Sequence, residues 1–124
     1  MNTRVLLIDD DSDEHDIFSS ALRNFDSRII CVTANSWIES SMLLQHFLPD
    51  IIFLDYNMPH TNGVQALALI KNIPDLRNTR VYIYSTAHGA DREGEVTRMG
   101  AVRWITKPSK IEDYHAIFNE VFSK

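Results

Sequence analysis

Short apolar runs alternate along the chain with stretches whose apolar residues recur at helical spacing. The runs predict five strands, at residues 5–8, 29–33, 51–54, 81–84 and 101–105. The third run shows almost no polar alternation, which is typical of a strand that is covered on both faces.

A candidate helix follows each run. The helices are predicted at residues 13–25, 37–47, 63–72, 91–99 and 111–122. Ser12 or Asp11 is a candidate N-cap of the first helix, and Asn35 or Ser36 of the second. Pro49 and Pro74 follow the second and third helices; proline cannot continue a helix because it lacks the N–H group.

Five strands that alternate with five helices imply parallel β-α-β units with right-handed crossovers. The length of 124 residues suits one domain of about 100–150 residues. We find no internal repeat and no linker, so the sequence predicts a single α/β domain over residues 1–124. The fifth helix reaches the end of this sequence, and no output domain is expected.

The formal net charge of -5 argues against non-specific binding to nucleic acid or to an anionic membrane. No signal peptide is visible, and no apolar run approaches the ~20 residues that a membrane span needs. Cys31 stands alone in an apolar run, which favours a small buried side chain in a reducing compartment. We expect a cytoplasmic protein without direct nucleic-acid binding or membrane insertion.

Chemically useful side chains stand where the first, third, fourth and fifth runs end. They are Asp9, Asp10, Asp11, Asp55, Ser85 and Lys107. In open parallel sheets, ligands bind beyond the carboxyl ends of the strands. Carboxylates suit a hard cation such as Mg²⁺, and a carboxylate can also accept a phosphoryl group. A lysine and a hydroxyl can contact phosphoryl oxygens. From chemistry alone, several of the acidic residues could be the acceptor.

Each candidate has a structural alternative. The acidic run could be a solvated loop, Asp55 a turn residue, Ser85 a hydrogen-bonding group at a strand end, and Trp104 a packing residue. The histidines are scattered, with no pair at helical spacing, which favours surface or loop positions over a zinc site. They are His15, His46, His60, His88 and His115.

In combination, four motifs resemble the receiver domain of bacterial response regulators across essentially the whole chain. The motifs are Val5-Leu6-Leu7-Ile8-Asp9-Asp10-Asp11, Ile52-Phe53-Leu54-Asp55-Tyr56-Asn57-Met58-Pro59 with Gly63 following, Tyr84-Ser85-Thr86-Ala87, and Lys107-Pro108. The resemblance implies a doubly wound, flavodoxin-like fold. Its parallel five-stranded sheet would have the order 2-1-3-4-5 and helices on both faces.

The resemblance also implies a phosphorylation site. Asp55 would be the phosphoacceptor. Mg²⁺ or Mn²⁺ would be held by Asp9, Asp10, Asp55 and the backbone carbonyl of Asn57. Asp10 would coordinate the ion directly, and Asp9 more often through water.

Four further residues receive roles from the same resemblance. Lys107 and Ser85 would contact the phosphoryl group, and Ser85 and Trp104 would form the switch. The bond between Lys107 and Pro108 is a candidate cis peptide.

Three departures from the family pattern affect these expectations. Trp104 is larger than the usual tyrosine or phenylalanine, so we expect its inward rotamer to be harder to reach. Thr86 is β-branched and is expected to narrow access to the site. Ala87 offers no side chain that could orient water, which leaves the acyl-phosphate lifetime open.

The function that the resemblance implies is phosphoryl transfer to Asp55 from a histidine kinase or a histidine phosphotransfer protein. Mg²⁺-dependent self-phosphorylation and autodephosphorylation would accompany it, without the activity of a conventional enzyme. The modified protein would signal to a partner through the fourth helix, fifth strand and fifth helix, as a monomer or as a phosphorylation-dependent dimer.

Two other classes of function are alternatives. The first is a receiver-like interaction module that works without phosphorylation. The second is a flavodoxin-like small-molecule binder, which would need a loop rich in Gly, Ser or Thr after the first strand. This chain has acidic residues at that position.

Overall fold

The computed structural model describes residues 2–87, 89 and 91–123, and its five strands form one parallel sheet. The strands are β1 Arg4–Ile8, β2 Ile30–Ala34, β3 Ile51–Asp55, β4 Arg80–Ser85 and β5 Arg103–Thr106. Their order is β2-β1-β3-β4-β5, which confirms the expected topology. The chain reverses direction across the sheet beside β1, so the residues that follow β1 and β3 lie at a switch point.

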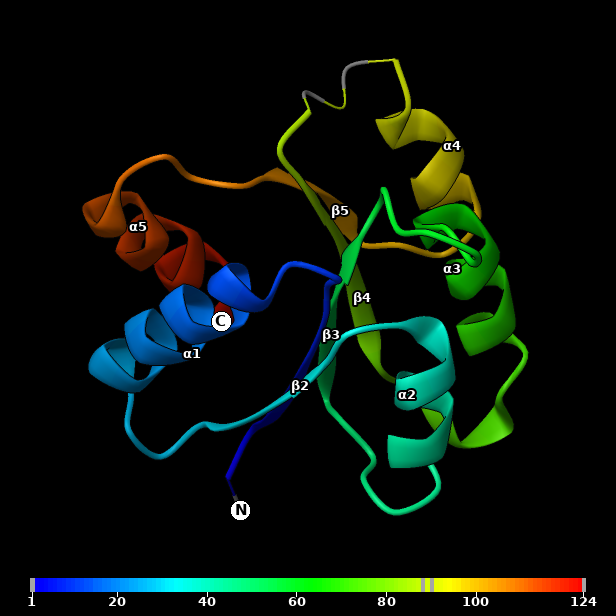
Figure 1. The fold of residues 1–124 in the computed structure, drawn as a ribbon, viewed down its shortest axis with the longest axis horizontal. Helices are drawn as coiled ribbons and strands as arrows, with labels where there is room; N and C mark the ends of the chain where they lie inside the picture. Colours follow the sequence, from blue (N-terminus) through cyan, green and yellow to red (C-terminus); the bar gives the residue numbers. More distant parts are fainter. Residues whose placement is uncertain (1, 88, 90, 124) are drawn as a thin grey trace.

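The helices cover both faces of this sheet. They are α1 Ser12–Phe25, α2 Trp37–Leu43, α3 Gly63–Lys71, α4 Glu93–Arg98 and α5 Ile111–Phe122, with a short 3-10 helix, η1, at Pro74–Leu76. Figure 1 shows α1 and α5 on one face and α2, α3 and α4 on the other. Successive strand residues point to opposite faces, so the apolar runs supply two separate cores.

The core beneath α1 and α5 is built around aromatic rings. Phe18 on α1 lies edge-on to Phe53 of β3, with ring centroids 5.0 Å apart. The same ring meets Tyr84 at 5.6 Å and Phe118 at 5.3 Å. These edge-to-face contacts join both helices to the middle of the sheet.

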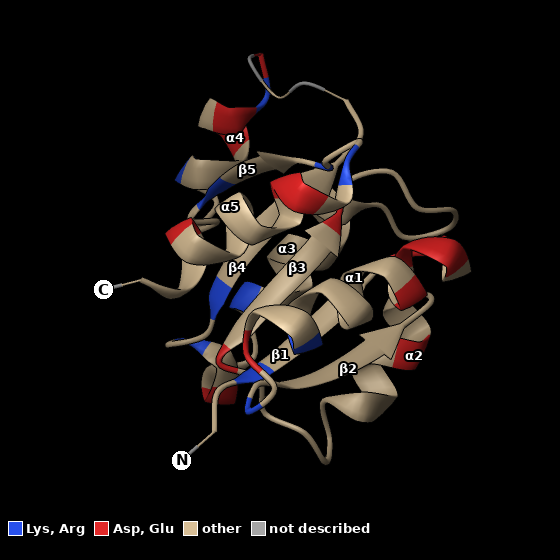
Figure 2. Ribbon diagram, turned by 90° about the vertical axis from the view of Figure 1, so that its left-hand side faces the viewer, with Lys and Arg blue, Asp and Glu red and all other residues tan. Residues whose placement is uncertain are grey.

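Side-chain caps fix the starts of three helices. Asp11 accepts from the N–H of Asp13 at the start of α1, and Ser36 caps α2 in the same way. Asn62 and Gln65 form a capping box at the start of α3. The acidic first turns of α1, α4 and α5 are visible in Figure 2. Of the alternatives for the first two caps, the structure selects Asp11 and Ser36.

The predicted end of α2 is wrong. The helix stops at Leu43 rather than at Phe47. Gln45 and His46 donate their N–H groups to the carbonyls of Met42 and Leu43, three residues back. Such bonds tighten a terminal turn and end the α-helix.

The predicted start of the fifth strand is also wrong, because residues 101 and 102 precede β5. Gly100 has a φ of 109° and donates to the carbonyl of Thr97 at 3.0 Å. Ala101 donates to Val96 at 3.0 Å. This pair of bonds is a Schellman motif, so Ala101 completes the end of α4 instead of entering the strand.

The proposed cis bond between Lys107 and Pro108 is wrong as well, since no peptide bond in the described ranges is cis. None of the helices described here has the length and apolar character to cross a membrane.

Candidate functional site

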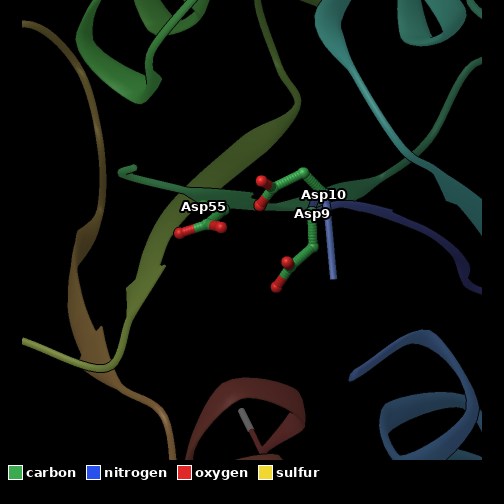
Figure 3. A group of neighbouring side chains, drawn as sticks. All are labelled: Asp9, Asp10 and Asp55. Atoms are coloured by element: carbon green, nitrogen blue, oxygen red, sulfur yellow. The ribbon is translucent and has the colours of Figure 1, made fainter. Parts of the chain in front are cut away.

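Three carboxylates meet where β1 and β3 end. Asp9 directly follows β1 and is fully buried, and Asp55 is the last residue of β3 with 5% of its surface exposed. Asp10 is exposed. One oxygen from each side chain lies within 4.8 Å of the others, and Figure 3 shows the three groups gathered at this edge. The sheet thus brings together Asp9, Asp10 and Asp55 of the acidic residues that the sequence suggested, whereas Asp11 caps α1.

The ammonium of Lys107 reaches this cluster from the end of β5. Its Nζ lies 2.7 Å from Asp9 Oδ2 and 3.8 Å from Asp55 Oδ2. The backbone N–H of Lys107 donates to the carbonyl of Ser85 at 2.7 Å, which ties the ends of β4 and β5 together. Burial lowers the pKa of Lys107, but the Asp9 and Asp55 carboxylates outweigh it and hold the pKa above its ordinary value.

Backbone groups orient the two buried carboxylates. Asp9 Oδ1 accepts from the N–H of Asp11 at 2.9 Å, and Asp55 Oδ1 accepts from the N–H of Asn57 at 3.2 Å. The ring Nε2 of His15 lies 2.6 Å from the carbonyl of Asp9. The other oxygen of each carboxylate is the one that faces Lys107.

The cluster holds more negative than positive charge. Burial, followed by the charge of Asp9, raises the pKa of Asp55 to about 7, although Lys107 and the N–H of Asn57 partly oppose this shift. Three carboxylates share one neighbouring ammonium, so a divalent cation would relieve their repulsion. Hard oxygen donors of this kind fit Mg²⁺ or Mn²⁺. The chemistry of the donor set therefore suits the expected metal.

Ser85 closes the site on the β4 side. It is the last residue of β4 and is 1% exposed, and its Oγ accepts from the N–H of Ala87 at 3.3 Å. Thr86 is exposed at the rim. The effect of Thr86 on access stays a prediction.

Trp104 is buried, with 5% of its surface exposed. The expectation that its size makes an inward rotamer harder to reach stays a prediction. Its ring centroid lies 4.8 Å from that of Tyr56, and its Nε1–H donates to the carbonyl of Ala87 at 3.1 Å. Its backbone N–H donates to Glu93 Oε2 at 3.0 Å. A Cβ at Gly89 would collide with the indole. The space that Gly89 leaves open accommodates the larger ring.

Gly63 lets α3 approach the end of β3. A Cβ at this position would lie 2.6 Å from the carbonyl oxygen of Asp55 and 2.7 Å from the Cα of Tyr56. Gly63 also donates its N–H to the carbonyl of Tyr56 at 2.9 Å. The backbone around Asp55 therefore depends on the absence of a side chain at residue 63.

We expect Gly63→Ala to lower the free energy of unfolding by about 1–3 kcal/mol, because the contacts are with backbone atoms that cannot rotate away. Urea denaturation measures the change. Gly94→Ala is the matched control. Its Cβ would meet only the guanidinium of Arg98 at 3.3 Å, on exposed α4, and alanine is favoured in helices by roughly 0.5–1 kcal/mol. Equal effects of both variants would contradict this account of Gly63.

Sequence reasoning missed one buried acidic residue. Glu14 is 8% exposed and accepts hydrogen bonds from the hydroxyls of Tyr84 and Tyr114. A buried tyrosine needs a partner for its hydroxyl. The sequence feature that could have revealed this role of Glu14 is the presence of Tyr84 and Tyr114 at core positions.

In the part of the chain that the structure describes, the histidines do not form a cluster that could bind zinc. Within it, the only group of three or more potential metal ligands is Asp9, Asp10 and Asp55. His88 lies outside the described residues.

Comparisons with known proteins identify the family of this chain. The chain matches the family model of the response regulator receiver domain over residues 5–119. It is 28% identical over 109 residues to the probable C4-dicarboxylate response regulator DctR of Bacillus subtilis, covering 88% of this chain and 47% of DctR. It is 34% identical over 108 residues to a protein-glutamate methylesterase/protein-glutamine glutaminase of Thermotoga maritima, covering 85% of this chain and 30% of that protein. The chain thus spans less than half the length of these two relatives.

A solved structure shows the same fold. The chemotaxis response regulator CheY4 of Vibrio cholerae superimposes with a TM-score of 0.85 and 23% identity, covering 98% of this chain and 100% of that one. The family match extends over nearly all of the sequence, from β1 into α5. The chain therefore belongs to the receiver domain family of the response regulators of two-component systems.

Proposed function

We propose that Asp55 accepts a phosphoryl group in a reaction that depends on a divalent cation. The observation that carries the proposal is the cluster at the sheet edge, where Asp9, Asp10 and Asp55 lie within 4.8 Å and Lys107 contacts two of them. Family membership supports it, since phosphorylation is typical of receiver domains.

The residues that would hold Mg²⁺ or Mn²⁺ are Asp9, Asp10, Asp55 and the backbone carbonyl of Asn57. Receiver domains bind Mg²⁺ at an acidic pocket, and this cluster fits that description. The bound cation would supply charge neutralisation and would orient the oxygens of the transferring group.

In the transfer itself, a carboxylate oxygen of Asp55 forms a bond to phosphorus as the bond between phosphorus and the donor breaks. Asp55 must be ionised for this step, and the raised pKa of about 7 shows how strongly its surroundings oppose ionisation without a cation. Lys107, whose Nζ lies 3.8 Å from Asp55 Oδ2, would contact a phosphoryl oxygen. Ser85 would donate its hydroxyl to another.

The donor would be a phosphohistidine of a kinase or phosphotransfer protein. CheY-type receiver domains interact with histidine kinases and downstream targets. A downstream protein would bind the face formed by α4, β5 and α5. The bond from Trp104 to Glu93 joins β5 to α4, and residues of β5 and α5 line a cavity of about 330 Å³. Phosphorylation-dependent dimerisation through this face is a second way to signal.

Incubation with acetyl phosphate and Mg²⁺ tests the proposal. The intact mass should increase by one phosphoryl group, and Asp55→Asn should abolish the increase completely. Chelation of the metal should abolish it as well.

Asp16→Asn is the matched control, because Asp16 is exposed on α1 away from the cluster, and it should label like the wild type. A wild-type mass that does not change with active donor would favour a module that works without phosphorylation. Labelling that persists in Asp55→Asn would place the acceptor elsewhere.

A further inference from the structure

A buried carboxylate lies in the first turn of α1, outside the acidic cluster. Glu14 Oε2 accepts from the hydroxyl of Tyr84 at 2.7 Å and from the hydroxyl of Tyr114 at 2.9 Å. These two hydrogen bonds join three separate elements, namely α1, β4 and α5. Figure 1 shows α1 and α5 side by side on this face of the sheet.

Stability alone does not explain a carboxylate at this position. Burying a charge is costly unless hydrogen bonds compensate, and apolar residues of similar volume are often equally stabilising. The surroundings are aromatic, with Phe18 in edge contact with both Tyr84 and Phe118. Burial and then the charge of Glu14 raise the pKa of the Tyr84 hydroxyl, so that it remains a donor. Glu14 therefore holds both hydroxyls in fixed directions.

Tyr84 connects this cluster to the phosphoacceptor site. The Nζ of Lys107 lies 5.5 Å from the centroid of the Tyr84 ring, within the range of a cation–π contact. The same Nζ lies 2.7 Å from Asp9. Tyr84 pairs with Asp55 in the sheet register and immediately precedes Ser85. The hydroxyl of Tyr84 thus bonds to Glu14, while the Lys107 ammonium lies over the face of the same ring.

The geometry points to Glu14 as a positioning residue for phosphoryl transfer. Through the hydroxyl of Tyr84, it fixes the ring against which the Lys107 ammonium rests, and thereby sets the position of that ammonium between Asp9 and Asp55. This inference rests on the proposed function, because transfer requires Lys107 to turn from Asp9 towards the new phosphoryl group. A fixed ring restricts the ammonium to that short movement.

Two conservative variants test this role against a matched third. Tyr84→Phe keeps the ring and removes the hydroxyl that bonds to Glu14. Glu14→Gln keeps the size of the side chain and removes its charge. Tyr114→Phe removes the other hydroxyl from the same carboxylate, and within the described residues neither a hydrogen bond nor a cation–π contact joins Tyr114 to Lys107. We expect Tyr84→Phe and Glu14→Gln to slow labelling by acetyl phosphate about three- to tenfold, the range that a cation–π contact can supply. Tyr114→Phe should label at nearly the wild-type rate. Equal slowing by all three variants would indicate a purely structural role and overturn the inference.

A second measurement does not need phosphorylation. The Tyr84 ring current should shift the NMR signals of the Lys107 ε-methylene protons, and Lys107→Met assigns these signals by their loss. Tyr84→Phe and Glu14→Gln should move them towards the positions of an exposed lysine, while Tyr114→Phe should leave them in place. Unchanged Lys107 signals in Tyr84→Phe would overturn the inference, and this variant carries the test if Glu14→Gln does not fold. A wild type that shows the shifted signals but accepts no phosphoryl group would refute the proposed function and leave the positioning intact.

Discussion

Asp55→Asn is expected to raise the free energy of unfolding of the metal-free protein at pH 8, by up to about 4 kcal/mol. Asparagine retains the shape of the side chain but carries no charge beside Asp9. In the wild type, burial and then the charge of Asp9 raise the pKa of Asp55 from 3.8 to about 7. The ionised carboxylate is therefore less favourable in the folded chain than in the unfolded one.

The direction of the pH dependence follows from proton binding. Between pH 4 and pH 7 the folded wild type holds a proton on Asp55 that the unfolded chain has lost. Stability contributed by this group is fully present below about pH 4 and is lost as the pH rises through about 7. The advantage of Asp55→Asn over the wild type should thus grow steadily from pH 5 to pH 8.

Urea denaturation with a metal chelator at pH 5 and at pH 8 measures this difference. Adding Mg²⁺ at pH 8 should stabilise the wild type much more than Asp55→Asn, since the wild type retains all three carboxylates. Asp16→Asn provides the baseline for an exposed carboxylate. A difference between Asp55→Asn and wild type that stays constant with pH would contradict the assigned electrostatics.

Lys107→Met is expected to have the opposite effect and to lower the free energy of unfolding by about 3–5 kcal/mol at pH 8 without metal. The methionine fills much of the volume of the lysine stem but leaves Asp9 and Asp55 without their ammonium. Asp9 is fully buried, and its Oδ2 has Lys107 as its ion-pair partner at 2.7 Å. An uncompensated buried charge is among the most destabilising changes in a protein.

The control for this variant is Lys110→Met, because Lys110 is exposed at the start of α5. It should change stability by no more than about 0.5 kcal/mol. Mg²⁺ should restore part of the loss in Lys107→Met, and adding Asp55→Asn should restore another part by removing one of the repelling charges. If Lys107→Met unfolds at the same urea concentration as Lys110→Met, the ion pair does not stabilise the fold.

The sheet and the acidic site could be predicted because each depends on local sequence. Strands covered on both faces require continuous apolar runs, and Ile51–Leu54 is such a run. The carboxyl ends of parallel strands meet at one edge, so Asp9 and Asp55 could be placed together before any distance was known. Family resemblance then distinguished Asp55 from its acidic neighbours, which chemistry alone could not do.

The features of the structure that the sequence did not predict depend on contacts between distant parts of the chain. Glu14 and Tyr84 are 70 residues apart, and nothing in the pattern of α1 reveals that this carboxylate turns into the core. The space beside Gly89 that accommodates the Trp104 ring is likewise a tertiary feature, which the sequence does not reveal. The start of β5 was predicted too early because Ala101 reads as an apolar strand residue, while its N–H completes the cap of α4.

The burial of Trp104 also gives this protein an internal optical reporter. The sequence contains two tryptophans, and the other, Trp37, lies on α2 at the opposite end of the sheet from β5. Indole emission changes in colour and intensity with the polarity of its surroundings. In a Trp37→Phe chain, the single remaining indole would touch both the Ala87 carbonyl and the Tyr56 ring. The fluorescence of Trp104 would then report structural changes beside Asp55 in real time, without any attached dye.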